Sequence, residues 1–116
     1  KDIKIELIFL KDDKKEETII KKLNQYVNPN LYTICLSEEG SQLSSKEFSN
    51  LIYKQSKDII FLIGGPDGHP QKIRERSSFL LSYSFMTFPH EMALLMLSEQ
   101  IFRAVSIRNG HKYHRD

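Results

Sequence analysis

The chain has few of the residues that quickly assign a sequence to a structural class. It contains no tryptophan, one cysteine, 5 glycines and 4 prolines in 116 residues. A single cysteine cannot build a disulfide framework within the chain, which suits a reducing cytoplasm. Cys35 lies in the mainly apolar run 31–36, so we expect a buried small hydrophobe and not a nucleophile.

Long apolar runs and a strong net charge are also missing. No stretch approaches the length of a membrane helix, and no signal peptide precedes the first predicted strand, so we expect no membrane partner. No group of His, Cys and Asp has the spacing of metal ligands, so we expect no metal. The formal net charge of +2 does not by itself indicate a nucleic-acid partner.

The charge is nevertheless uneven, because cations gather near the end of the chain. Arg103, Arg108, Lys112 and Arg115 lie there with only two acids nearby. Such a cluster can neutralise RNA phosphates. Cations also favour the carboxyl end of a helix, and that explanation is sufficient for Arg103 and Arg108 but weaker beyond them.

The hydrophobic pattern predicts one domain over residues 1–116, since 40% hydrophobic residues can supply one modest core. Strands alternate with helices, which predicts an α/β fold with a mainly parallel sheet flanked by helices. The run 37–44 is expected to be a polar loop, and Ser44 to Glu47 reads as a capping box. The predicted strands are 3–10, 31–36, 59–63 and 78–85. One helix is predicted to end at about residue 26, and three further helices are predicted to begin at residues 44, 70 and 89.

The run 59–63 is rich in β-branched residues and closed by Gly64 and Gly65, which predicts a central strand covered on both faces. Two glycines at the carboxyl end of a strand let backbone groups approach a ligand. A tight strand-to-helix turn without a ligand explains the same residues equally well. The pattern fits neither a dinucleotide-binding fingerprint nor a P-loop.

Three motifs occur in a distinctive order: Leu-Ile-Gly-Gly-Pro-Asp-Gly-His at 62–69, Thr-Phe-Pro-His-Glu at 87–91 and Tyr-His-Arg at 113–115. Together they resemble the RlmH family, SPOUT-class methyltransferases that modify a pseudouridine of large-subunit ribosomal RNA. The resemblance is dense from residue 58 to 116 and covers the first half only through its order of strands and helices. It implies a carboxyl-terminal trefoil knot.

The resemblance further implies S-adenosylmethionine as methyl donor and N3 of a pseudouridine in ribosomal RNA, free or in the assembled ribosome, as acceptor. Backbone groups and apolar side chains would hold the donor, as in other small-molecule pockets. For Phe85, a purely structural role in the core remains open. The implied cofactor-binding residues are Leu36, Gly64, Gly65, Tyr83, Ser84, Phe85, Met86, Thr87 and Phe88.

His90 begins a predicted helix, where the dipole would keep its imidazole neutral, so we expect it to act as a base or to position the acceptor. Capping or packing is an equally good account of it. Tyr113, His114 and Arg115 suit stacking on an RNA base and contact with phosphate. Arg103 could join them, although its default partner is Glu99, four residues earlier.

The last helix is apolar around most of its circumference from residue 92 to 97, so it needs two packing partners. One is expected to be the sheet. The other is either a helix of the same chain or, as the resemblance implies and we favour, the same helix of a second subunit in a homodimer.

Two features depart from the family pattern. Leu94 replaces an arginine that usually follows the Pro-His histidine by four residues, and the family's first strand and helix have no counterpart ahead of residue 3. The main alternative function is therefore a non-catalytic RNA- or ribosome-binding module that keeps the fold, which cofactor binding would distinguish. A third reading is a small α/β regulatory domain unrelated to the family, favoured if the protein were monomeric and unknotted.

Overall fold

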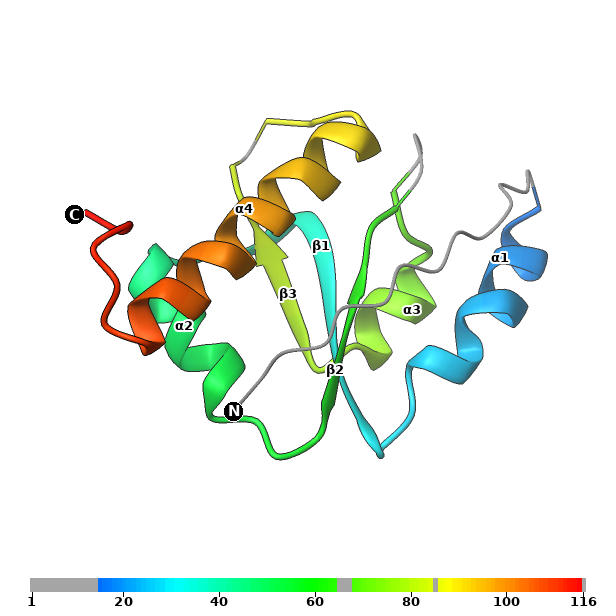
Figure 1. The fold of residues 1–116 in the computed structure, drawn as a ribbon. Coiled ribbons are helices and arrows are strands. Elements are labelled where there is room, and N and C mark those ends of the chain that lie inside the picture. The colour runs from blue at the N-terminus through cyan, green and yellow to red at the C-terminus, as the bar shows by residue number, and fades with distance from the viewer. Residues whose placement is uncertain (1–14, 65–67, 85, 116) are drawn as a thin grey trace.

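A computed structural model describes residues 15–64, 68–84 and 86–115 of the chain. Helices and strands alternate in it, as the sequence predicts for an α/β protein (Figure 1). The predicted strand at 3–10 lies outside the described residues. The elements are α1 (Glu16–Leu23), the short 3₁₀ helix η1 (Asn24–Tyr26), β1 (Leu31–Gln42), α2 (Ser45–Tyr53), β2 (Asp58–Leu62), α3 (Gln71–Arg76), β3 (Phe79–Ser82) and α4 (His90–Arg108).

The described sheet is fully parallel and has the strand order β2-β1-β3. The prediction of a mainly parallel sheet is therefore confirmed. β1 occupies the centre, where Ile34 and Cys35 have no exposed surface. The expectation that 59–63 forms the central strand is wrong for the described sheet, because β2 is flanked there only by β1 and its residues Asp58 to Phe61 are incompletely buried.

β1 also bends around β3. Leu81 is the register partner of both Leu36 and Ser41, so backbone of β1 lies along both edges of β3. Residues 37–40 make the bend, and Gly40 passes so close that an added Cβ would lie 2.6 Å from the carbonyl carbon and oxygen of Leu80. The predicted loop at 37–44 is thus wrong in part, since the strand extends to Gln42 across this bend.

Two layers of helices cover the sheet, α2 and α4 on one face and α1 and α3 on the other (Figure 1). Alternate strand residues point to opposite faces, which divides the core in two. The first core cluster contains Ile34, Phe48, Leu51, Ile52, Leu81, Leu97 and Ala104. The second contains Leu23, Val27, Leu62 and Ile73.

Local signals place two of these helices. Ser44 caps α2 as predicted: its hydroxyl accepts the Glu47 N–H at 3.1 Å, and the Glu47 carboxylate accepts the Ser44 N–H at 2.8 Å. Pro89 is the N-cap of α4, so the proline opens this helix as expected. No described helix is long and apolar enough to cross a membrane.

No trefoil knot is visible in the described part of the chain. The knot that the resemblance implies would involve the turns after β2 and β3. Residues 65–67 and 85 of those turns lie outside the described residues.

Candidate functional site

The three parallel strands end at one edge of the sheet, which we call the carboxyl edge. Ligands of open α/β sheets bind at this edge. Leu36 lies in β1 just before its bend, Gly64 follows β2, and Tyr83 follows β3, so three of the predicted cofactor-binding residues reach the same edge. Leu36, Ile63 and Tyr83 all pack against the first core cluster.

The turn after β2 is held by a buried histidine. His69 Nε2 lies 3.1 Å from the carbonyl oxygen of Leu62, so this nitrogen carries the proton and donates it. Burial lowers the pKa of His69, which keeps the ring neutral. A Cβ on Gly64 would lie 3.1 Å from the carbonyl carbon of Gly68 and 3.2 Å from His69 Nε2, so Gly64 accommodates this close turn. Gly65 lies outside the described residues.

The segment after β3 is fixed by local hydrogen bonds. Burial raises the pKa of the Tyr83 phenol. The Tyr83 hydroxyl donates a hydrogen bond to the carbonyl oxygen of Ala93 in α4 at 3.0 Å. The carbonyl oxygen of Ser84 accepts a hydrogen bond from the Ser82 hydroxyl at 2.7 Å, and the hydroxyl of Ser84 accepts one from the Met86 N–H at 3.0 Å. Met86 is 74% exposed, while Phe88 is half-buried. Phe85 lies outside the described residues.

The bend of β1 reaches two neighbouring elements. The Thr87 hydroxyl donates to Glu38 Oε2 at 2.5 Å, and Arg74 Nη1 of α3 lies 3.3 Å from Glu39 Oε2. These contacts tie the segment after β3 and helix α3 to one bend. Sequence reasoning did not single out Glu38 or Glu39, because in sequence they are two acids of a polar stretch.

His90 is the first residue of α4, at the end of the segment that follows β3. Its side chain is 56% exposed, and Nε2 lies 3.9 Å from Glu91 Oε1. The imidazole is therefore accessible to a ligand from solution.

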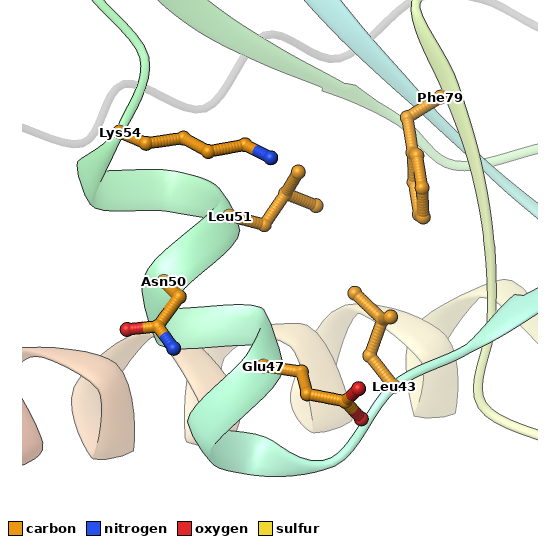
Figure 2. A pocket seen from close by; sticks show the side chains of 6 residues that line it. All are labelled: Leu43, Glu47, Asn50, Leu51, Lys54 and Phe79. Atoms are coloured by element: carbon orange, nitrogen blue, oxygen red, sulfur yellow. The ribbon is translucent and has the colours of Figure 1, made fainter.

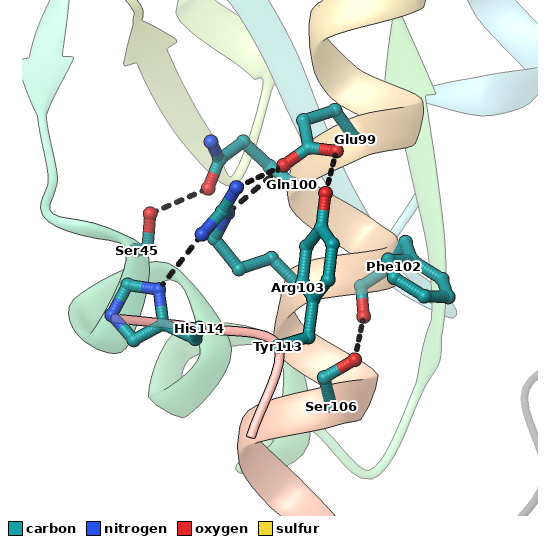
Figure 3. A network of polar contacts seen from close by, with 8 residues as sticks. All are labelled: Ser45, Glu99, Gln100, Phe102, Arg103, Ser106, Tyr113 and His114. Carbon is teal, nitrogen blue, oxygen red and sulfur yellow. Dashed lines mark hydrogen bonds and ion pairs between the residues drawn. The ribbon is translucent and has the colours of Figure 1, made fainter. Parts of the chain in front are cut away.

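The carboxyl-terminal tail folds back on α4 around Glu99 (Figure 3). Arg103 Nε and Nη2 both donate to Glu99 Oε1, at 2.9 and 2.5 Å, and the Tyr113 hydroxyl donates to Glu99 Oε2 at 2.9 Å. Arg103 Nη1 lies 3.2 Å from His114 Nδ1, which must accept because a guanidinium only donates. Three of the four predicted RNA-binding residues are thus brought together, while Arg115 is exposed beyond them.

Ring contacts and charge strengthen this arrangement. The Arg103 guanidinium stands 4.8 Å from the centre of the Tyr113 ring, and Phe102 meets that ring edge-on at 4.8 Å. Hydrogen bonds from Arg103 and Tyr113 lower the pKa of Glu99, and the bond to Glu99 raises the pKa of Tyr113. The default pairing of Arg103 with Glu99 is therefore present, and it also holds the tail.

One side of α4 packs on α2 through buried residues such as Leu97 and Ala104. A helix of the same chain therefore covers that side, which was one of the two alternatives for the second packing partner. Other apolar side chains of α4 remain exposed: Met92 by 46%, Leu95 by 65% and Phe102 by 55%.

Two surface hollows lie away from the carboxyl edge. One, of about 250 Å³, opens between α2 and the start of β3, with Leu51 and Phe79 as apolar walls and Glu47 and Lys54 among its polar ones (Figure 2). The other, of about 350 Å³, lies where the strands begin. None of the predicted cofactor-binding residues that the structure describes lines either hollow. In residues 15–64, 68–84 and 86–115, no three His, Cys, Asp or Glu side chains gather closely enough to bind a metal ion.

Comparison with known proteins gives consistent matches. A family model described as "Predicted SPOUT methyltransferase" matches residues 2–114. A protein of Bartonella tribocorum named "Ribosomal RNA large subunit methyltransferase H" is 43% identical over 99 residues, which cover 82% of this chain and 62% of that protein. A protein of the same name from Prochlorococcus marinus is 50% identical over 94 residues, covering 80% of this chain and 68% of its own length. A third protein of this name, from Dictyoglomus thermophilum, is 44% identical over 105 residues, which cover 87% of this chain and 66% of that protein. The chain thus spans roughly two thirds of the length of these relatives.

Proposed function

Because the chain belongs to the SPOUT methyltransferase family, we propose that it transfers a methyl group from S-adenosylmethionine to N3 of a pseudouridine in large-subunit ribosomal RNA. The observation that carries this proposal is the carboxyl edge of the sheet, which Leu36, Gly64 and Tyr83 reach from three separate parts of the chain. The names of the relatives support the substrate, since all three given above contain the words ribosomal RNA large subunit methyltransferase.

The described residues suit a donor of this kind. Gly64 leaves backbone accessible at a turn that a side chain would crowd, and Leu36 offers a half-buried apolar surface. Segment 83–88 adds backbone groups on a fixed scaffold, with Gly65 and Phe85 assigned from sequence. S-adenosylmethionine would supply an electrophilic methyl group there, and the chain would supply binding and orientation.

The acceptor is an imide nitrogen, which must lose its proton before it can attack the methyl group. His90 is exposed at the start of α4, directly after the proposed cofactor-binding segment. We assign it the role of holding the acceptor or taking its proton. A His90→Asn variant with unchanged methyl transfer would remove this assignment.

Arg103, Tyr113, His114 and Arg115 form the proposed RNA contact. The network around Glu99 presents an arginine, an aromatic ring and an imidazole on one patch, a combination that can stack on a base and bind phosphate. A chain truncated after Lys112 should therefore lose affinity for ribosomal RNA.

The proposed enzyme is a cytoplasmic homodimer that pairs through the exposed apolar side of α4. Met92, Leu95 and Phe102 would be buried by a second copy. Leu95→Glu should then sediment as a monomer, whereas Lys72→Glu, at an exposed position of α3 on the other face of the sheet, should not. If both variants sediment like the wild type, this interface is wrong.

The second candidate function is a binding module that retains the fold but has lost methyl transfer. It is favoured by one observation, that Leu94 stands where the family pattern has an arginine. A module of this kind has no need of a methyl donor, so cofactor binding separates the two functions.

Titration with S-adenosylmethionine in a calorimeter tests the proposal. Leu36→Ala should weaken binding by about three- to tenfold, because Leu36 is already half-buried and only about half of the roughly 1.5–3 kcal/mol for burying a leucine remains to be gained. Leu43→Ala is the matched control, since Leu43 is also half-buried and packs against the same core but lines a hollow elsewhere. Equal loss of affinity in both variants, or no binding by the folded wild type, would contradict the proposed site.

A further inference from the structure

The larger hollow lies at the opposite edge of the sheet from the proposed cofactor site. β1, β2 and β3 all begin there, and the hollow has a volume of about 350 Å³. Its lining combines apolar residues with two cations. Its lining residues are Val27, Asn28, Pro29, Leu31, Lys57, Arg76 and Ser78.

Arg76 is fixed in the wall of this hollow without being neutralised. Nη1 donates to the side-chain oxygen of Asn24, and Nη2 donates to the carbonyl oxygen of Val27 at 3.0 Å. Both acceptors are uncharged. A guanidinium has five N–H groups, so further donors remain for a ligand.

Lys57 adds a second cation to the same hollow. In the described ranges, neither Lys57 nor Arg76 lies within ion-pair distance of a carboxylate, and the neighbouring Asp58 pairs with neither. The Ser78 hydroxyl accepts the Thr33 N–H at 2.9 Å, which leaves its own hydrogen able to donate. Three donor groups, two of them cationic, therefore line one hollow.

A purely structural role accounts for only part of this arrangement. Arg76 links the end of α3 to the first residue of η1 and to Val27 directly after it, which explains its two hydrogen bonds. It does not explain why Lys57, on the segment before β2, lines the same hollow with no carboxylate of residues 15–64, 68–84 or 86–115 to balance the two charges.

We infer that this hollow binds a phosphate group, carried either by the RNA backbone or by a free nucleotide. Arg76 and Lys57 would hold the phosphate oxygens, since arginine offers a fixed fork of donors and lysine a mobile point charge. Val27, Pro29 and Leu31 would contact the apolar faces of the attached sugar or base. The site is separate from the proposed cofactor site and does not depend on methyl transfer.

The test compares two charge-neutralising variants of the full chain. Lys57→Gln removes a cation from this hollow, and Lys54→Gln removes an exposed cation from the smaller hollow beside Glu47. Lys57→Arg keeps the charge and should retain binding. The probes are uridine monophosphate and a fragment of large-subunit ribosomal RNA, titrated at several salt concentrations.

If the phosphate belongs to RNA, Lys57→Gln should weaken RNA binding severalfold and reduce the slope of log affinity against log salt by about one. If it belongs to a free nucleotide, the same variant should lose binding of uridine monophosphate with RNA affinity unchanged. The inference is overturned if Lys57→Gln behaves like Lys54→Gln with both probes, or if the wild type binds neither.

Discussion

The close passage of β1 over β3 makes Gly40 the most constrained glycine of the described residues. A Cβ at this position would lie 2.6 Å from the carbonyl carbon and oxygen of Leu80 and 2.8 Å from the nitrogen of Leu81. These are backbone atoms of a strand paired on both sides, so they cannot move aside as a flexible side chain could. Gly40→Ala must therefore displace one strand from the other.

The expected cost is about 1–3 kcal/mol, the usual range for forcing one extra carbon into a packed interior. It follows that Gly40→Ala should lower the midpoint of urea unfolding by about 0.3–3 M, given slopes of about 1–3 kcal/mol/M for small domains. Ser41→Ala is the matched control, because Ser41 is the next residue of the same strand and its side chain is exposed. Its midpoint should stay close to that of the wild type.

The reasoning would be refuted if Gly40→Ala unfolded within about 0.5 kcal/mol of the wild type, a change typical of surface substitutions. A lowered midpoint shared equally by Ser41→Ala would also contradict it. That result would mean that the bend tolerates no change at all, whereas the structure attributes the constraint to one close contact.

Three further predictions concern other buried or bonded groups. Burial lowers the pKa of His69, so the unfolded chain binds more protons than the folded chain as pH falls through about 6.5. The free energy of unfolding of the wild type should therefore decline there by up to about 1.4 kcal/mol per pH unit. His69→Gln cannot titrate at this position and should lack this component of the decline. Equal pH profiles from denaturant unfolding would contradict the burial of His69. Burial raises the pKa of the Cys35 thiol to about 11 and leaves the side chain no exposed surface. A thiol reagent should therefore label Cys35 only as fast as the protein opens. Rapid labelling of the native protein would contradict the burial of Cys35. Glu99→Gln should weaken the contact of the tail with α4 and speed proteolysis after Lys112, whereas Glu91→Gln at the start of α4 should not.

The features that the sequence predicts correctly depend on local chemistry. The capping box at Ser44 and Glu47 and the proline at the start of α4 are both confirmed, because each acts within one turn of helix. Cys35 is buried as predicted, since it sits in an apolar strand. The alternation of strands and helices indicated a parallel sheet, and the described sheet is parallel.

The features that the sequence does not predict depend on contacts between distant parts of the chain. Serines and glutamates at 37–42 look like a loop, and only pairing with Leu81 shows that the strand continues past Gly40. The order of strands is likewise set by tertiary packing, so the composition of 59–63 could not show that β1 takes the centre.

Within the candidate site, the partners of the predicted residues cannot be read from the sequence. Arg103 was expected to pair with Glu99, but the capture of Tyr113 and His114 by the same pair requires the tail to turn back. His69 is a buried hydrogen-bond donor that holds the turn after β2, a role that its sequence neighbours do not indicate. The contact between Thr87 and Glu38 spans nearly fifty residues and leaves no sequence signal.

The most direct test of the proposed function is methyl transfer by the purified full chain to large-subunit ribosomal RNA or ribosomes that lack the modification, using S-adenosylmethionine with a labelled methyl group. We expect label in the RNA and N3-methylpseudouridine in the digested nucleosides, with Leu36→Ala impaired and Leu43→Ala active. A folded protein that binds the RNA but transfers no methyl group to either substrate would contradict the enzyme and favour the binding module.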